Sequence, residues 1–210
     1  MDNRTKQQLR KPDQFVSTTE RGIHWARENR QQATTYGIIV VAAIGIFVGS
    51  YSWYNHRSAA ADDAFGAAMQ TYMTPIATPD QQVPPGTKTF SSESERAKAA
   101  NPAFVAVAQK YGMTPSGKIA EYFAGLSYME EDQTASAEAA FKQTAGSWNG
   151  NLSALGKQAL AHLYQQTGRD SMAIDLYNEL AKQDAATVPA GLAKIELAEL
   201  YQSEGKSDEA

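Results

Sequence analysis

The sequence predicts an all-α protein in which one apolar helix near the N-terminus precedes a stack of helical hairpins. Residues 36–54 form an uncharged, predominantly apolar stretch. After it, helix-forming residues recur with helical spacing, whereas the Val and Ile clusters from which a sheet is built are scarce. Three later segments then repeat one pattern of small and aromatic residues. The 210 residues allow one or two domains.

The composition excludes several functional classes. Residues 1–30 contain seven Lys/Arg and four Asp/Glu, whereas residues 57–210 contain twelve and nineteen. An acidic body is unsuited to nucleic acid, because the phosphates repel it. The chain contains no cysteine, which excludes disulfides, thiolate catalysis and Cys-ligated metal centres.

A transmembrane helix is predicted at residues 31–56. Arg30 and Arg57 enclose a segment without Asp, Glu, Lys or Arg, and a hydrocarbon core requires about 20 helical residues. A charge at the middle of such a helix costs about 2.5–3.5 kcal/mol on insertion scales, so a charge-free window of this length favours a single span. Aromatic residues, which favour the membrane interface, stand at both ends: Tyr36, Tyr51, Trp53 and Tyr54.

The flanking charges predict the orientation of this helix. Arg21, Arg27 and Arg30 precede it closely, whereas Arg57 is the only basic residue among the thirty that follow. Basic flanks stay inside, so the N-terminus is expected in the cytoplasm. The alternative is a cleaved signal peptide, with the alanines at 59–61 as the cleavage site; the thirty-residue leader and the span-length apolar core favour an anchor.

Glycines in the predicted span form a smooth strip. Gly45 and Gly49 make a GxxxG pair, and Gly37 falls on the same face two turns earlier. Such a strip allows close approach of a second helix, so a membrane partner or a homo-oligomer is one interpretation. The alternative is that glycine is common in transmembrane helices in general.

Capping signals mark helices on both sides of the span. In the tail, Ser17 and Glu20 spell a capping box, which predicts a helix running toward the membrane with Trp25 at headgroup level and His24 on the surface. After the span, a helix is predicted over residues 59–74. Four prolines then predict a disordered loop at residues 75–92.

Further signals predict where the next helices begin and end. Ser92 and Glu95 spell a second capping box, and Asn101 before Pro102 resembles an N-cap with proline at the first helical position. Gly112 should end that helix, and Thr114 before Pro115 should begin the next one.

The repeated pattern follows from aligning three segments at intervals of 36 and 37 residues. The aligned columns are Gly125, Ala161 and Ala198; Tyr128, Tyr164 and Tyr201; Ala137, Ala173 and Ala210; and Phe141 with Tyr177. Gly168 and Gly205 fall at the turn between helices, and Asp132 is a weaker match there. The columns resemble tetratricopeptide repeats, in which small residues let helices cross closely and aromatic residues fill the gaps. An α-solenoid of helix pairs is therefore predicted.

The first helix of each pair is expected to line a concave groove for an extended peptide or a partner helix. The predicted lining is Tyr122, Leu126 and Met129; Gln158, His162 and Gln165; and Ile195, Glu199 and Gln202. It is apolar at one end and polar to acidic at the other. The alternative for Tyr122 and Leu126 is packing beneath the preceding helix, and for His162 a solvated surface position.

No enzymatic motif is complete, and no catalytic residue, metal site or cofactor is predicted. Three scattered histidines have no metal-ligand spacing, and no serine elbow exists. Residues 150–157 nearly spell a phosphate loop, but the glycines are one residue too far apart and the magnesium-binding hydroxyl after Lys157 is missing. A turn that leads into a helix is the better interpretation.

The order and spacing of several features along the whole chain resemble those of a known protein family. This resemblance rests on residues 13–14 (DQ) and 25–29 (WAREN), on the glycine-dotted span ending at 53–55 (WYN), and on the alanine-rich helix and repeats that follow. The whole chain resembles the YfgM-like family of ancillary translocon subunits, bacterial inner-membrane proteins with periplasmic repeats. The resemblance implies association with the SecYEG channel and with periplasmic chaperones or exported polypeptides. The loop at residues 75–92 is an insertion relative to that family.

The predicted organisation is a cytoplasmic tail (1–30), a transmembrane helix (31–56), a helical region with the loop (57–112) and about two and a half periplasmic repeats (113–210). The third repeat stops within its second helix at Ala210 without a polar cap, so we expect the natural protein to continue. Three functions stay open. They are a protein-binding scaffold at the translocon, an assembly platform for cytochrome maturation or outer-membrane biogenesis, and a self-associating structural membrane protein.

Overall fold

The computed structural model describes residues 24–77, 86, 88–183, 185–203 and 205, and the regular elements within them are helices. One isolated bridge joins Ile76 to Phe90. The predicted all-α class is therefore confirmed. The chain divides between Tyr54 and Asn55 into two compact units, and we call the second unit, Asn55–Ala210, the body.

Helix α3, Arg30–Tyr72, contains the predicted transmembrane segment. Among the described residues it is the one helix long and apolar enough to cross a membrane. The large apolar side chains of residues 38–47 are 56–73 % exposed, so the described residues do not cover them. The predicted span and the helix predicted at 59–74 are parts of this one continuous helix. No Gly or Pro interrupts residues 50–65, and the alanines at 59–61 favour helix.

The described part of the tail is a short helical segment before α3. Residues 24–28 are helical, and a turn at Asn29 follows. The Trp25 ring stacks on that of Tyr36 with 6.3 Å between centroids. The side chain of His24 is 77 % exposed and lies 3.4 Å from Glu28, in agreement with the predicted surface position. The predicted cap at residues 17–20 lies outside the described residues.

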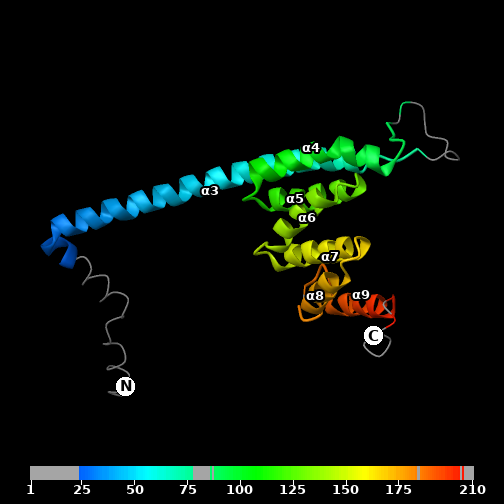
Figure 1. Cartoon of the computed structure of the whole chain (residues 1–210). Coiled ribbons are helices and arrows are strands. Elements are labelled where there is room, and N and C mark those ends of the chain that lie inside the picture. Colours follow the sequence, from blue (N-terminus) through cyan, green and yellow to red (C-terminus); the bar gives the residue numbers. More distant parts are fainter. Residues whose placement is uncertain (1–23, 78–85, 87, 184, 204, 206–210) are drawn as a thin grey trace, which may run out of the picture. The chain divides into compact units, whose positions relative to one another are not determined.

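The body continues with helices that pack on one another in chain order (Figure 1). Their bounds are α4, Glu93–Tyr111; α5, Pro115–Glu130; α6, Thr134–Ala145; α7, Gly150–Gln166; α8, Asp170–Leu180; and α9, Ala190–Ser203. Most predicted boundaries are confirmed. Ser92 Oγ accepts a hydrogen bond from Glu95 N, Thr114 Oγ1 accepts one from Gly117 N, and Gly112 follows the last residue of α4.

Helix α4 runs through Pro102, so the prediction of a second helix start at Asn101 was wrong. Proline cannot donate the usual helical hydrogen bond, yet apolar residues on both sides of it lie on one buried face, including Ala97 and Phe104. Asn101 is 5 % exposed, and its Nδ2 donates to the carbonyl oxygen of Ala124 in α5 at 3.4 Å. Packing against neighbours therefore outweighs the local start signal.

The first core of the body lies between the C-terminal part of α3, α4 and α5. Ala61 and Ala68 of α3 are buried there. The rings of Phe104 and Phe123 lie 5.4 Å apart, and the rings of Phe65 and Tyr72 each lie 5.7–5.9 Å from both of them. Tyr72 donates a hydrogen bond of 2.5 Å to Glu130 Oε1. Burial, followed by that hydrogen bond, raises the pKa of Tyr72, so the phenol stays neutral.

The second core lies between α5, α6, α7, α8 and α9 and includes many residues of the aligned columns. Ala137, Ala161, Ala173, Phe141 and Tyr177 are 0 % exposed. Tyr164 is 2 % exposed, whereas Tyr128 and Tyr201 are only partly buried. Ala210 lies outside the described residues. The repeat pattern thus marks core positions.

The three predicted turn positions share one backbone conformation. Asp132, Gly168 and Gly205 have φ angles of 58°, 69° and 74°. Asp132 is the non-glycine residue with positive φ among the described residues. The predicted turn residues thus adopt the left-handed conformation that glycine accommodates, and at position 132 aspartate tolerates it better than most residues.

The two ends of the predicted loop at 75–92 approach each other. Ala77 N donates to Phe90 O at 2.8 Å, and Phe90 N donates to Pro75 O at 3.0 Å. Phe90 is 8 % exposed. Residues 78–85 and 87 lie outside the described residues. The prediction of a disordered loop therefore falls mostly on residues that the structure does not describe.

Candidate functional site

A concave site of about 190 Å³ lies between α5 and α7, where the sequence predicts the first two parts of a groove. Its lining is Tyr122, Leu126, Met129, Gln158, Ala159 and His162. The spacing of four and three residues puts the α5 members on one face of that helix, and four residues likewise separate the two polar members on α7. Five predicted lining residues therefore meet at one cavity.

The α5 side of the cavity is apolar and anchored in the core. Tyr122, Leu126 and Met129 are partly buried and pack against the second core. The Tyr122 ring lies edge-on to Phe123 at 5.6 Å and 6.0 Å from Phe141. Burial raises the pKa of the Tyr122 phenol, which therefore stays a neutral hydrogen-bonding group at physiological pH. These side chains are thus partly buried against the second core and also line the cavity.

The α7 side is polar and borders acidic residues. His162 Nε2 lies 3.4 Å from Glu196 Oε2 of α9, and the two side chains are 40 % and 24 % exposed. The His162 ring also lies 6.1 Å from the Tyr177 ring. His162 is therefore half-exposed at the rim, beside a carboxylate that would pair with it if it were protonated.

The other predicted groove residues do not reach this cavity. Gln165 Oε1 accepts a hydrogen bond of 2.9 Å from Tyr177 Oη, so its amide is engaged with α8. Ile195, Glu199 and Gln202 are exposed on α9, with Ile195 at 57 %. An exposed row on α9 and a half-buried cavity between α5 and α7 are therefore separate features of the body.

The glycines of the predicted span are open on the side where a side chain would project. A Cβ built on Gly37, Gly45 or Gly49 would meet no atom within 4 Å. Within the part of the chain that the structure describes, nothing therefore covers the strip, as a helix-packing face requires.

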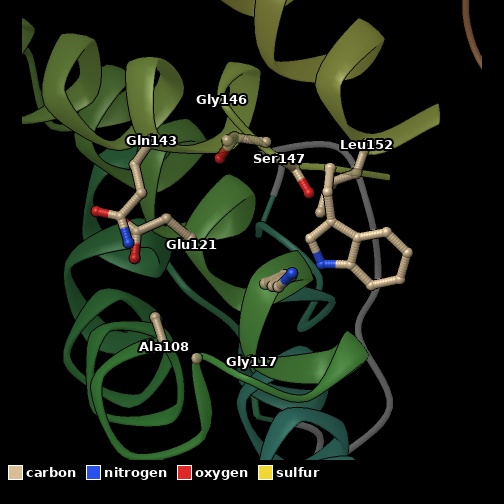
Figure 2. A pocket seen from close by; sticks show the side chains of 11 residues that line it. Ala108, Gly117, Glu121, Gln143, Gly146, Ser147 and Leu152 are labelled. Carbon is tan, nitrogen blue, oxygen red and sulfur yellow. The ribbon is translucent and has the colours of Figure 1, made fainter. Parts of the chain in front are cut away.

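A second pocket, of about 200 Å³, was not predicted from the sequence (Figure 2). It lies where the end of α4, the start of α5 and the loop between α6 and α7 meet. In Figure 2, Glu121 and Gln143 lie on one side of the pocket, and Ser147 and Leu152 lie on the other. The pocket joins residues from three separate stretches of chain, so no local pattern announces it.

Two charged side chains enter this second pocket from α5. Burial raises the pKa of Glu121, whose carboxylate has no ion-pair partner among the described residues. Lys118 Nζ lies 4.6 Å from the centroid of the Trp148 ring, a cation–π arrangement. The sequence signal that could have indicated this pocket is Trp148, a large aromatic residue between a serine and an asparagine in a loop. Residues 150–157, the near phosphate loop, are the first two turns of α7 itself and not a turn that leads into it, and Asn149 Oδ1 accepts a hydrogen bond from Leu152 N at the start of this helix.

Within the described ranges, no group of three or more His, Cys, Asp or Glu is arranged to hold a metal ion. Comparison of the chain with protein-family models, with curated proteins and with solved structures gave no significant match. The site is therefore defined by its own geometry: a small cavity, apolar on one wall and amide- and imidazole-bearing on the other.

Proposed function

We propose that this chain is a single-pass, membrane-anchored scaffold that binds proteins on the periplasmic side of a bacterial inner membrane. In this proposal the N-terminus is cytoplasmic, and α5–α9 form tetratricopeptide-like helix pairs. The partners are the SecYEG translocon and the periplasmic chaperones or exported polypeptides near it. The partner assignment rests on the resemblance to the YfgM-like family.

The anchor is supported by the surface of α3. Its apolar side chains between Arg30 and Tyr54 are exposed, and exposing so many of them to water is unfavourable. A bilayer would cover them over about 20 residues, the length that a span requires. The basic residues before the helix support the proposed orientation.

The helix-pair arrangement is supported by equivalent details at each repeat. The three positive φ angles recur at the repeat interval. Gly125 and Phe141 touch at the first helix crossing, since a Cβ on Gly125 would lie 2.5 Å from Phe141 Cε1. Ala161 and Tyr177, the equivalent residues, are fully buried in the same core. Sequential packing of neighbours is the mode of contact in repeat arrays.

The observation that carries the binding proposal is the cavity between α5 and α7. A small number of polar groups on one wall and apolar side chains on the other is the usual composition of a recognition site. Leu126 and Met129 would cover an apolar side chain of the ligand, while Gln158 and His162 would bind its backbone. An extended segment lying along the groove satisfies both requirements.

Site-directed photocrosslinking in the intact membrane tests this proposal. A photoreactive amino acid at Leu126 or His162 should capture translocon subunits, periplasmic chaperones or an exported polypeptide. The matched control is Met172 on α8, which is 42 % exposed and does not line the cavity. Capture of another envelope machine would support the assembly-platform alternative, and capture of the chain alone would support self-association. Equal yields from Leu126 and Met172 would refute the groove.

A topology reporter tests the anchor separately. Alkaline phosphatase fused after Ser203 should be active in intact cells, and the protein should resist extraction from membranes by carbonate. An inactive fusion would reverse the orientation, whereas a carbonate-soluble product would remove the anchor.

A further inference from the structure

Two neighbouring loops of the body expose large apolar side chains. Residues 112–114 join α4 to α5 and residues 147–149 lie between α6 and α7, and we call these two loops the tip. Met113 is 79 % exposed and Trp148 is 87 % exposed, more than any other large apolar side chain among the described residues. The loops are adjacent, because Gly112 and Trp148 line the same pocket. An apolar patch of this kind marks a contact surface.

The tip lies at the end of the body where α3 enters it. Arg57 of α3 donates a hydrogen bond to the carbonyl oxygen of Lys110, and its guanidinium carbon lies 5.4 Å from the centroid of the Tyr111 ring. Five residues further along α3, the Asp62 carboxylate accepts a hydrogen bond from Ser116 Oγ. Residues on both sides of the loop at 112–114 therefore contact α3 just after the body begins at Asn55.

Covalent connection keeps this end close to the apolar segment. Tyr54 closes the aromatic end of that segment, and Arg57 follows three residues later. Three residues span at most about 10 Å when fully extended. Arg57 therefore lies within about 10 Å of Tyr54 however the two units are arranged. If Tyr54 is at a membrane interface, the tip is beside the same interface.

The chain segments around the tip contain few carboxylates. No Asp or Glu occurs in residues 96–120 or 139–169, although the whole chain has 23 acidic and 19 basic residues. The carboxylates beside the tip are Glu121, which lines the pocket with Trp148, and Asp62 of α3. Lys110 and Lys118 flank the first loop, and their ammonium groups lie 5.1 Å from the Tyr111 ring and 4.6 Å from the Trp148 ring. Lysines with apolar stems beside aromatic rings suit a membrane surface that carries anionic headgroups.

We propose that the tip of the body rests in the headgroup layer of the bilayer, with Trp148 and Met113 at the depth of the lipid carbonyls and Lys110 and Lys118 paired with anionic phosphates. This inference rests on the proposed membrane anchor. It adds a second attachment, which holds the body against the membrane and limits how far it can swing.

Tryptophan fluorescence of the full chain in lipid vesicles tests the inference. The chain has three tryptophans, so the double variant Trp25→Phe, Trp53→Phe leaves Trp148 as the sole fluorophore. The vesicles contain phosphatidylcholine and phosphatidylglycerol, with or without lipids brominated near the carbonyl end of the acyl chain. Brominated lipid should lower Trp148 emission by about half, and aqueous iodide should quench it weakly.

Two further sole-tryptophan variants provide matched controls. In the first, Trp53 is kept while the other two tryptophans are changed to Phe, and it reports on the anchor. In the second, Met73→Trp is introduced into a chain in which all three native tryptophans are Phe. Met73 is 73 % exposed but follows Arg57 by sixteen residues, about 24 Å along a helix. Its emission should be quenched by iodide and unaffected by brominated lipid.

The outcomes separate the inference from the anchor. If brominated lipid quenches Trp53 but leaves Trp148 as accessible to iodide as the tryptophan at 73, the anchor stands and the inference is refuted. That result would leave the tip for a protein partner. If Trp53 is not quenched either, both proposals are overturned.

The charge variant Lys110→Gln, Lys118→Gln tests the anionic component. It should increase iodide quenching of Trp148 in vesicles with phosphatidylglycerol and have no effect in vesicles of phosphatidylcholine alone. Equal iodide quenching with and without the two lysines, in both kinds of vesicle, would refute the pairing with anionic headgroups.

Discussion

The hairpins α5–α6 and α7–α8 carry different residues at two aligned positions of the sequence pattern. In the first, glycine faces a phenylalanine ring: a Cβ on Gly125 would lie 2.5 Å from Phe141 Cε1. In the second, Ala161 already carries that Cβ and Tyr177 supplies the ring, both fully buried. The comparison teaches that different pairs of a small and an aromatic residue can fill these aligned positions while both members stay buried.

The largest effect is expected from removing either ring. Phe141→Ala and Tyr177→Ala should each lower the free energy of unfolding by about 3–5 kcal/mol, because both rings are completely buried. Thermal unfolding of the full chain in detergent, followed by circular dichroism, measures this. The exposed control Ile195→Ala should change it by less than about 0.5 kcal/mol. Equal effects at Phe141 and Ile195 would mean that the first hairpin has no core of its own.

A smaller effect is expected when Gly125 of the first hairpin is replaced by alanine, the residue at the aligned position 161 of the second hairpin. Gly125→Ala should destabilise the chain by about 1–3 kcal/mol, since the buried Phe141 ring cannot move away without strain. The double variant Gly125→Ala, Phe141→Leu should recover part of the loss, because the smaller side chain makes room. The same thermal assay applies. A stabilising Gly125→Ala would show that helix propensity outweighs packing here.

The turns of the two hairpins should respond with opposite signs. Gly168→Ala should cost about 1–2 kcal/mol, because its φ of 69° is unfavourable for a residue with a Cβ. Asp132→Gly, at a φ of 58°, should instead be neutral or stabilise the chain by up to about 1 kcal/mol. Urea titration of both variants measures the two changes. A destabilising Asp132→Gly would point to a contact of the aspartate side chain.

The smallest effect is expected at the contact between the two hairpins. Glu138 of α6 accepts hydrogen bonds of 2.7 Å from Lys142 and of 2.7 Å from Arg169 in the α7–α8 turn. These bonds lower the pKa of Glu138 from 4.5 to about 2. Because the pKa of Glu138 is lower in the folded than in the unfolded state, its ionised carboxylate stabilises the folded chain above pH 4.5. This contribution to the free energy of unfolding is lost as the pH falls toward 2.

The variant Glu138→Gln should therefore lose less of its free energy of unfolding than the unmodified chain as the pH falls from 4.5 toward 2. Its cost at pH 7 should be below about 1 kcal/mol, because Lys142 is half-exposed and water screens the pair. Unfolding in urea at several pH values measures both quantities. An unchanged pH profile in the variant would assign the acid sensitivity to other carboxylates.

Local chemistry made much of the fold predictable. The caps at Ser92 and Thr114, the turns at Gly168 and Gly205 and the small and aromatic columns each act within one or two helical turns, so their signals lie in the sequence itself. The same holds for the apolar stretch of α3, whose length and lack of charge are visible without a structure.

Tertiary packing decided the features that the sequence did not predict. Asn101 and Pro102 spell a helix start, but burial of the face around them keeps α4 continuous. The pocket beside Glu121 and Trp148 combines three stretches of chain, so no spacing within one stretch predicts it. For the groove, helical spacing placed Tyr122 and His162 at one cavity. It did not predict that Gln165 would be engaged with Tyr177 on α8.

The sharing of α3 between the apolar segment and the first core affects how this protein is made. Ala61, Phe65 and Ala68 are covered by α4 and α5, which the ribosome synthesises later. At about 5–20 residues per second, several seconds pass between the appearance of Ala68 and that of Ala124. During that interval these side chains have no native partner. The early part of the body is therefore the stretch of the nascent chain that most needs protection from aggregation.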